Sequence, residues 1–178
     1  SCQIPVLLFP GNSCQVTSFA DGILFLSLIS GRNPDFLIGQ HVISAPIIKK
    51  MGLEVVPTGY ILIETGATTS VEYMSNTKPI PSSKPEIVVA TALAGEMLGH
   101  KMLYFEGGSG TNNVIDNQII KAVKESVSVP IMVGGGVRTT SQMLQAFDSG
   151  ADIVVLGTIL EEKPTMITDF CKALKYDK

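Results

Sequence analysis

Short apolar runs alternate with longer mixed segments along the whole chain, and this alternation limits the possible folds more than any other feature. The runs at residues 4–9, 23–27, 54–64, 101–106, 129–133 and 152–156 are the expected strands. Because none of them alternates strictly between apolar and polar residues, each is typical of a strand buried on both faces of a parallel sheet. The segments between them predict helices at residues 37–51, 85–99, 115–126, 141–149 and 165–176. This repeated order predicts an α/β fold.

Two of the intervening segments lead to more specific expectations. In the helix at residues 37–51, apolar residues recur at roughly helical spacing and predict a stripe that packs on the sheet. The residues of this stripe are Leu37, Val42, Ile43, Ile47 and Ile48. Residues 65–85 are polar, rich in Thr and Ser, and contain three prolines. We expect a long surface loop there, with a mobile cover over a site as the alternative, because loops of this length often serve function.

Two architectures fit the expected strands and helices, an open doubly wound sheet and a closed (β/α)8 barrel. A barrel takes about 250 residues, or roughly 31 for each strand–helix unit. At that rate the 178 residues of this chain hold roughly 5.7 units, close to the six expected strands. The length therefore fits either a complete open sheet or a barrel that lacks two units, and does not choose between them.

The composition limits the possible partners and the compartment. Charged residues make up 16% of the chain and the net charge is −3, so no basic excess indicates a nucleic acid partner or an anionic membrane surface. The apolar runs are far shorter than the ~20 residues of a transmembrane helix. Cys2, Cys14 and Cys171 have no CxxC spacing, which argues against a disulfide framework or a zinc site. Reduced thiols favour a cytoplasmic protein.

Glycine-rich turns follow the last three expected strands, at residues 107–110, 134–136 and 157–158. In parallel α/β folds, ligands bind beyond the carboxyl ends of the strands. Glycines there let backbone N–H groups approach an anion closely. We therefore expect a phosphate site built from the three turns. The absence of a GxGxxG spacing and of a Walker A lysine argues against a dinucleotide or a nucleoside triphosphate.

Tyr104 and Glu106 are two residues apart on an expected strand, so both side chains face the same side. A carboxylate beside a phenol can bind and deprotonate a hydroxyl nucleophile, although a structural Glu at a strand end has the same sequence pattern. Arg138 follows the second glycine turn and suits either a bidentate phosphate contact or a surface ion pair. His41 and His100 are isolated, and no Ser-His-Asp set or histidine metal cluster can be assembled. Thiol and metal-hydrolase chemistry are therefore disfavoured.

Six short motifs carry a resemblance to a known family. They are LFPG at 8–11, DGILFLS at 21–27, PTGY at 57–60, YFEGGSG at 104–110, GGGVR at 134–138 and GT at 157–158. Together, and in this order, they resemble the geranylgeranylglyceryl phosphate synthase family, which includes the bacterial heptaprenylglyceryl phosphate synthases. The resemblance covers nearly the whole chain. Each motif is short, but their combination is specific.

The resemblance implies a modified TIM barrel and a Mg²⁺-dependent prenyltransferase. Such an enzyme transfers a geranylgeranyl group from geranylgeranyl diphosphate to the C3 hydroxyl of sn-glycerol 1-phosphate, forming an ether and releasing diphosphate. Heptaprenyl or farnesylgeranyl donors are the alternatives. A homo-oligomer with peripheral membrane contact at most, and without a nucleic acid partner, is expected.

The resemblance also implies the roles of the site residues. Tyr104 and Glu106 match residues that hold the glycerol hydroxyls, and Glu106 matches the acceptor of the nucleophile's proton. The implied glycerol phosphate site comprises Tyr104, Phe105, Glu106, Gly107, Gly108, Ser109, Gly110, Gly135, Gly136, Gly157 and Thr158, with Gly134 and Arg138 as further phosphate contacts. These positions agree with the phosphate site expected from the glycine turns.

The chain departs from the family pattern in two places. The family has two further strands ahead of LFPG, which carry an acidic segment and a Ser/Thr turn that position Mg²⁺. We therefore expect residues 1–178 to form a single, N-terminally incomplete barrel domain, with the metal ligands among about 60–70 preceding residues. The second departure is conservative, because Gly107 stands where many relatives have Ala. Another TIM-barrel phosphosugar isomerase or lyase, or a non-catalytic phosphate-binding subunit, remains an alternative.

Overall fold

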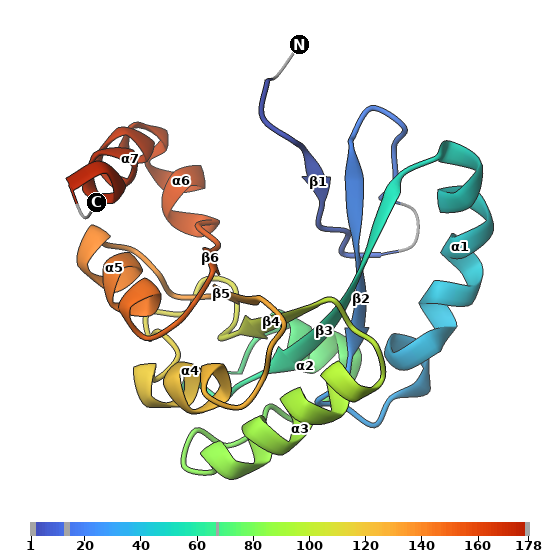
Figure 1. The fold of residues 1–178 in the computed structure, drawn as a ribbon, viewed down its shortest axis with the longest axis horizontal. Coiled ribbons are helices and arrows are strands. Elements are labelled where there is room, and N and C mark those ends of the chain that lie inside the picture. The colour runs from blue at the N-terminus through green and yellow to red at the C-terminus, as the bar shows by residue number, and fades with distance from the viewer. Residues whose placement is uncertain (1–2, 13–14, 67, 177–178) are drawn as a thin grey trace.

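The computed structural model describes residues 3–12, 15–66 and 68–176, and six strands within them form one parallel sheet. The strands are β1 (Leu7–Leu8), β2 (Gly22–Leu28), β3 (Glu54–Leu62), β4 (Met102–Glu106), β5 (Ile131–Gly134) and β6 (Ile153–Val154). Their order in the sheet is their order in the chain. In a doubly wound sheet the order of the strands reverses at a switch point. The order here has no reversal, so it is that of a barrel. Figure 1 shows the strands arranged as an open arc.

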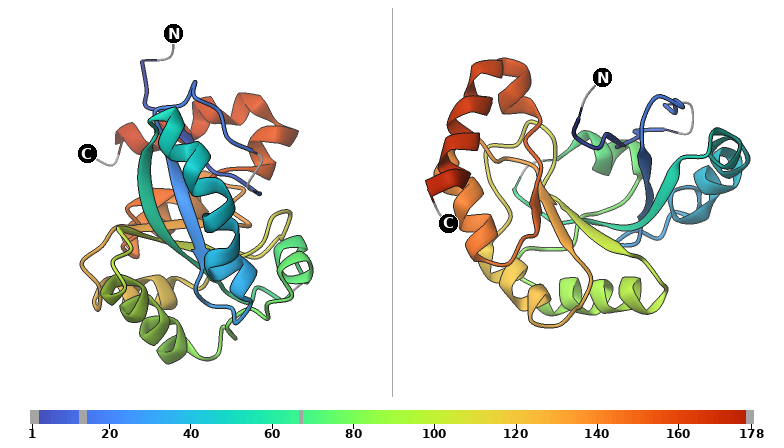
Figure 2. Two further views of the ribbon diagram at one scale, coloured as in Figure 1. Left: turned by 90° about the vertical axis from the view of Figure 1, so that its right-hand side faces the viewer. Right: turned by 45° about the horizontal axis from the view of Figure 1, so that its top comes forward.

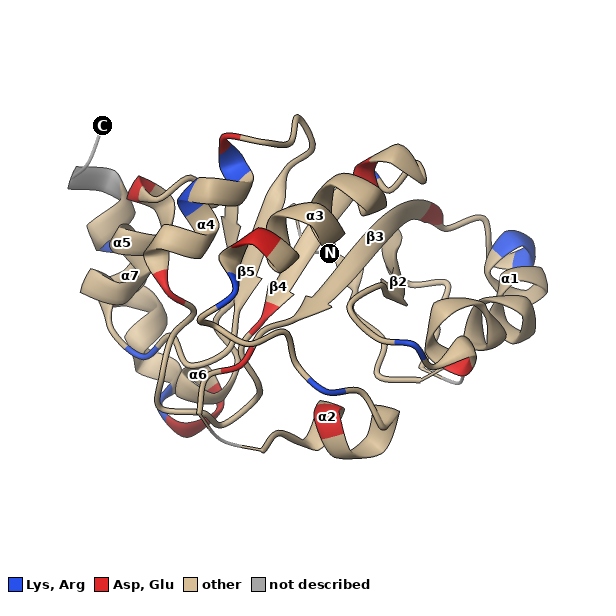
Figure 3. Ribbon diagram, turned by 90° about the horizontal axis from the view of Figure 1, so that it is seen from below, with Lys and Arg blue, Asp and Glu red and all other residues tan. Residues whose placement is uncertain are grey.

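Helices follow each strand from β2 onward and cover the outer face of the arc (Figure 2). They are η1 (Asp35–Gly39), α1 (Gln40–Met51), α2 (Ser70–Ser75), α3 (Pro85–Met97), α4 (Asn117–Lys124), α5 (Thr140–Asp148), α6 (Thr158–Glu162), η2 (Pro164–Met166) and α7 (Ile167–Tyr176). Here η1 is a π-helix and η2 a 3₁₀ turn. Among the described helices, none is long and apolar enough to cross a membrane. Charged residues are distributed over several helices and loops rather than gathered on one element (Figure 3).

Both faces of the sheet are buried at its centre, as the uninterrupted apolar runs predict, whereas Leu7 of β1 and Ile153 of β6 at its edges are exposed. On β4, Leu103 and Phe105 pack outward with residues of α3 and α4. Tyr104 packs on the opposite, inner face with Tyr60 and Met132 from the neighbouring strands. The inner face of the arc is therefore the side on which a site at the strand ends can form.

All six expected strands are present, but β1 and β6 are shorter than predicted. Ile4 is 73% exposed and precedes the two-residue β1. The prediction for residues 65–85 was wrong in part, because this segment contains α2 and a parallel bridge between Ile63 and Ile80. The sequence signal for α2 is Thr69 followed three residues later by Glu72, which is typical of a helix N-terminus.

The predicted apolar stripe of α1 is also wrong. Ile48 is buried, but Val42, Ile43 and Ile47 are exposed to 67%, 60% and 45%. The inward face of the helix is instead formed by His41, Ser44 and Ile48. The helix sits on β2 through polar as well as apolar side chains, since His41 Nε2 lies 3.0 Å from Ser27 Oγ. Burial lowers the pKa of His41.

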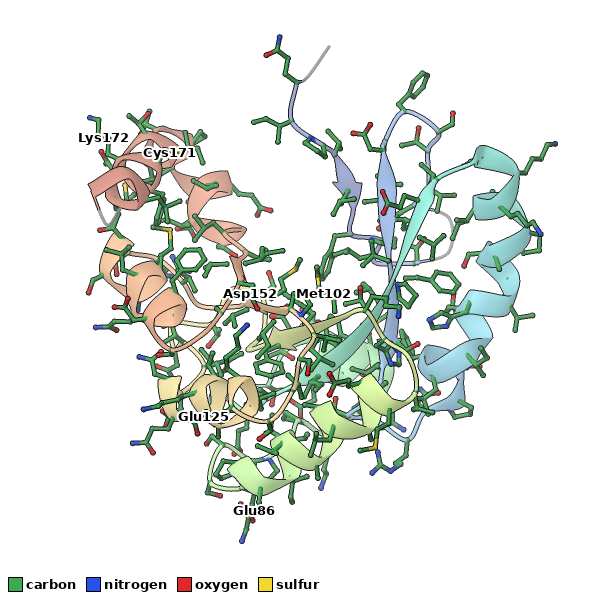
Figure 4. The ribbon with its side chains drawn as sticks, viewed as in Figure 1. Glu86, Met102, Glu125, Asp152, Cys171 and Lys172 are labelled. Carbon is green, nitrogen blue, oxygen red and sulfur yellow. The ribbon has the colours of Figure 1, made fainter. Side chains whose placement is uncertain are left out.

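Asp152 lies just before β6 and connects three elements. Its carboxylate accepts hydrogen bonds from Lys124 Nζ at 2.8 and 2.9 Å and from the Ile131 N–H at 2.8 Å. Burial opposes its ionisation, but these hydrogen bonds and the Lys124 charge lower the pKa of Asp152 below its ordinary value. In Figure 4 Asp152 lies inside the arc of helices, whereas Glu86 and Glu125 point away from the sheet. Asp152 therefore has a structural role, because it joins α4 and β5 to the start of β6.

Candidate active site

Tyr104 and Glu106 lie side by side on the inner face of β4, as their spacing predicts. The Tyr104 hydroxyl donates to Glu106 Oε2 at 2.6 Å, and the Gly108 N–H donates to Oε1 at 2.5 Å. Glu106 is 8% exposed and Tyr104 2%. The carboxylate is thus held in one orientation at the carboxyl end of the strand.

Burial sets the protonation behaviour of this group. It raises the pKa of Glu106, while the hydrogen bonds from Tyr104 and Gly108 act in the opposite direction. Burial, together with the Glu106 charge, raises the pKa of Tyr104 and of Tyr60 well above that of a free phenol. Both phenols therefore stay protonated near neutral pH, and Glu106 is the group that can take up a proton.

Two aromatic residues that the sequence did not single out as site residues complete this cluster. Tyr60 on β3 is the register partner of Tyr104, and their ring centroids lie 5.1 Å apart. Phe9 packs edge-on against Tyr104 at 5.0 Å and lies 6.5 Å from Tyr60. Parallel register places Tyr60 beside Tyr104, whereas Phe9 follows β1, which is not a neighbour of β4 in the sheet, and reaches Tyr104 because the sheet is curved.

A cavity of about 260 Å³ opens beside Glu106. We call it the polar cavity. It is lined by members of all three glycine turns, which the sequence predicted to converge. The predicted residues on its wall are Tyr104, Glu106, Ser109, Gly110, Gly135, Gly136, Arg138, Gly157 and Thr158. Phe9, Thr111, Val137, Val155 and Glu161 also line it, and none of them was assigned to the site from the sequence.

Four predicted residues do not line the polar cavity. Phe105 is fully buried on the outer face of β4, because side chains alternate along a strand. The N–H of Gly107 donates to the Gly134 carbonyl at 3.0 Å, and that of Gly108 donates to Glu106. Gly107, Gly108 and Gly134 therefore lie behind the wall of the polar cavity, and an anion in this cavity must be bound by the other residues of the glycine turns.

The second glycine turn needs glycine for both conformation and space. Gly135 and Gly136 have φ of +86° and +75°, a region that other residues rarely adopt. A Cβ on Gly135 would lie 2.8 Å from Glu106 Oε1 and 2.7 Å from the Gly108 nitrogen. The absence of a side chain therefore lets this turn approach the carboxylate directly.

Arg138 forms the ion pair that was one of the two interpretations of its sequence position. Its Nη1 donates to Glu162 Oε2 at 3.0 Å. Its Nε is buried and has no hydrogen-bond partner among the described residues. Arg138 also lines the polar cavity, so its positive charge lies at the wall of that cavity.

A second cavity, which we call the apolar groove, lies next to the aromatic cluster. It has a volume of about 540 Å³. Phe9 lines both the polar cavity and the apolar groove. The groove is lined by Phe9, Pro10, Gly11, Asn12, Leu26, Leu28, Phe36, Gln40, Tyr60, Ser70, Val71, Met74 and Ser75. Its walls are mainly apolar, so it suits a hydrocarbon chain.

Metal ligands were expected outside this chain. Among the residues that the structure describes, no group of three or more His, Cys, Asp or Glu side chains could hold a metal ion. The described residues therefore do not by themselves form a Mg²⁺ site.

Comparisons with known proteins agree with this geometry. Geranylgeranylglyceryl phosphate synthase of Chitinophaga pinensis is 51% identical over 173 residues, which are 97% of this chain and 69% of that protein. The enzyme of the same name from Methanosphaera stadtmanae is 44% identical over 160 residues, which are 90% of this chain and 65% of that protein.

A solved structure extends the likeness to the fold. The (S)-3-O-geranylgeranylglyceryl phosphate synthase of Thermoplasma acidophilum, in complex with its substrate sn-glycerol 1-phosphate, is 29% identical and superimposes with a TM-score of 0.87. The match covers 97% of this chain and 68% of that one. The model of the PcrB family matches residues 1–174. The chain therefore belongs to the PcrB family.

Proposed function

We propose that this chain forms the catalytic part of a geranylgeranylglyceryl phosphate synthase. The reaction transfers the geranylgeranyl group of geranylgeranyl diphosphate to the C3 hydroxyl of sn-glycerol 1-phosphate. One observation carries the proposal: the buried Glu106 carboxylate lines a polar cavity built from glycine turns, and Phe9 on the wall of this cavity also lines an apolar groove. A site for a small phosphate, which contains a base, and a site for a hydrocarbon chain thus share a wall.

The glycerol phosphate occupies the polar cavity in this proposal. Its phosphate accepts hydrogen bonds from the backbone of the turns around Gly110, Gly135 and Thr158, and Arg138 on the cavity wall adds a positive charge. The C3 hydroxyl then points at Glu106. The relative from T. acidophilum with bound sn-glycerol 1-phosphate supports this assignment of the ligand.

The prenyl chain occupies the apolar groove, with its C1 near the three aromatic rings. The bond between C1 and the diphosphate oxygen breaks, and the diphosphate leaves with the electron pair. The glycerol oxygen forms the new ether bond to C1, and its proton passes to Glu106. The faces of Tyr60, Tyr104 and Phe9 can stabilise positive charge developing on C1.

We further propose that the reaction depends on Mg²⁺. A divalent cation would neutralise the departing diphosphate. Because the described residues do not form the Mg²⁺ site, we propose that the metal ligands lie outside this chain. The roles given to Glu106 and the three aromatic rings do not involve the metal.

Assembly and location are also proposals. Exposed apolar side chains on α1 and α3, among them Val42 at 67% and Met97 at 82%, support a homo-oligomer, which sedimentation of the purified protein would test. The three cysteines without CxxC spacing support a cytoplasmic location. We also propose that residues 1–178 belong to one barrel domain.

The test is a transfer assay with the purified full-length protein. Geranylgeranyl diphosphate and sn-glycerol 1-phosphate should give the ether product in the presence of Mg²⁺, and sn-glycerol 1-phosphate should raise the melting temperature. Stabilisation by sugar phosphates but not by sn-glycerol 1-phosphate would favour an isomerase or lyase. A folded protein that binds glycerol phosphate and forms no product would favour a binding subunit.

A further inference from the structure

The two walls of the apolar groove come from segments far apart in the chain. One wall is formed by Phe36 of η1 and Gln40 of α1, and the facing wall by Val71, Met74 and Ser75 of α2. These walls belong to different strand–helix connections, so no sheet hydrogen bonds fix the distance between them. Some other contact must set the width of the groove.

Asn33 makes this contact. Its Nδ2 donates to the carbonyl of Ser75, the last residue of α2, at 2.7 Å. Its Oδ1 accepts from the N–H of Asp35, the first residue of η1, at 3.1 Å. The two partners fix the orientation of the amide, because an N–H can only donate and a carbonyl can only accept. We call this pair of hydrogen bonds the Asn33 clasp.

The surroundings of the clasp hold it in place. Ser75 is fully buried, and its carbonyl also accepts from Thr77 Oγ1 at 3.3 Å. Thr77 in turn packs against Gly31, where a Cβ would lie 2.6 Å from Thr77 Oγ1. The main chain of Asn33 accepts from the Leu37 N–H at 3.1 Å. The clasp therefore joins the exposed start of η1 to a buried carbonyl of α2.

We propose that Asn33 is a positioning residue that holds α2 against η1 and so sets the width of the apolar groove for the prenyl donor. The inference rests on the proposed function, because it assigns the groove to the prenyl chain. Asn33 itself does not line the groove, so it acts on the donor only through the walls. Loss of the clasp should weaken donor binding and leave the polar cavity unchanged.

The test is the variant Asn33→Asp in the full-length protein. Aspartate keeps the oxygen that accepts from Asp35 but presents an acceptor to the Ser75 carbonyl, so only the bond between the walls is lost. One hydrogen bond corresponds to about a two- to tenfold change in an equilibrium constant. We expect the KM for geranylgeranyl diphosphate to rise by that factor, with an unchanged KM for sn-glycerol 1-phosphate. The ratio of kcat/KM between geranylgeranyl and heptaprenyl diphosphates should move toward one.

Asn76→Asp is the matched control. It makes the same chemical change beside Ser75, at an exposed position with φ of +50°, which aspartate tolerates. The proposal is overturned if both variants have the same donor KM, or if Asn33→Asp raises both KM values equally. If Asn33→Asp does not fold, Asn33→Ala removes both hydrogen bonds of the clasp without adding a charge. A rise in donor KM alone then supports the proposal, and an unchanged donor KM contradicts it.

The same assay distinguishes a wrong inference about the Asn33 clasp from a wrong proposed function. If the proposed function is wrong, the wild-type protein forms no prenyl ether at all. If only the clasp is wrong, the wild type is active and Asn33→Asp retains the wild-type donor KM.

Discussion

At the residue scale, the proposed chemistry depends on one buried carboxylate, Glu106, whose surroundings set the pH at which it can accept a proton. Burial raises the pKa of Glu106 above its ordinary value. A general base must be ionised, so turnover should fall as the pH drops through this raised pKa. The midpoint of the acid limb in the pH profile of kcat should therefore lie above the ordinary glutamate pKa of about 4.3.

The pH profile has a simple control. Glu64→Gln removes an exposed carboxylate near the end of β3 and should leave the acid limb in place. An acid limb at or below the ordinary glutamate pKa would contradict the role of burial. The same raised pKa costs stability, since the ionised form is disfavoured in the folded state once the pH exceeds the ordinary pKa.

Neighbouring glycines in the first turn differ in what they tolerate. Gly107 has no positive φ, and a Cβ there would meet Thr65 Cγ2 at 3.0 Å. Gly108 has φ of +104°, and a Cβ would overlap the Thr69 methyl group. We expect Gly107→Ala to lower the free energy of unfolding by under ~1 kcal/mol and Gly108→Ala by about 1–3 kcal/mol. Urea denaturation with equal m-values measures both, and equal losses would contradict the assignment.

Single residues were predictable where one strand positions them. The shared face of Tyr104 and Glu106 follows from the two-residue period of β4, and the structure confirms it. Tyr60 reaches the same place through the register of β3 with β4 and Phe9 through the curvature of the sheet, and no local sequence pattern encodes either. The placement of Phe105 was wrong, because the motif as a whole was assigned to the site although its side chains alternate.

At the element scale, α2 lines the apolar groove and its N-terminus contacts the first glycine turn. Thr69 caps its N-terminus by accepting from the Glu72 N–H at 3.2 Å, and the Thr69 side chain packs on Gly108. Its other end is held by the Asn33 clasp. A six-residue helix has little intrinsic stability, so these end contacts determine whether it forms.

Removal of the cap tests this dependence. Thr69→Val keeps the shape of the side chain but removes the acceptor, at a cost of ~1 kcal/mol. Hydrogen exchange at the α2 amides should accelerate. Thr68→Val, the same change at the exposed neighbouring position, should leave the exchange rates unchanged. Equal rates in the two variants would show that the cap does not hold the helix.

The elements that were predicted poorly share a physical cause. Residues 65–85 contain α2 because of a cap and a clasp, which are side-chain to backbone contacts that composition does not reveal. The inward face of α1 carries His41 and Ser44, which bond to Ser27 and to the helix backbone. Apolar periodicity alone therefore selected the wrong face of this helix.

At the scale of the whole molecule, the alternation of runs predicted an α/β fold with six parallel strands, and the structure confirms it. Chain length could not decide between a doubly wound sheet and a barrel. The strand order decides in favour of the barrel, and the superposition on the T. acidophilum enzyme agrees. Phe9 lines both the polar cavity and the apolar groove because the sheet is curved. This curvature could not be predicted from the sequence.

The central claim is that Glu106 accepts the proton of a glycerol hydroxyl whose phosphate lies in the polar cavity. The most direct measurement compares prenyl transfer and sn-glycerol 1-phosphate binding by wild type and Glu106→Gln in the full-length protein. We expect the turnover of Glu106→Gln to fall by about a hundredfold or more. Its affinity for sn-glycerol 1-phosphate should stay within a few-fold of wild type, because the substitution does not touch the phosphate contacts. A Glu106→Gln variant with near-normal turnover would contradict it.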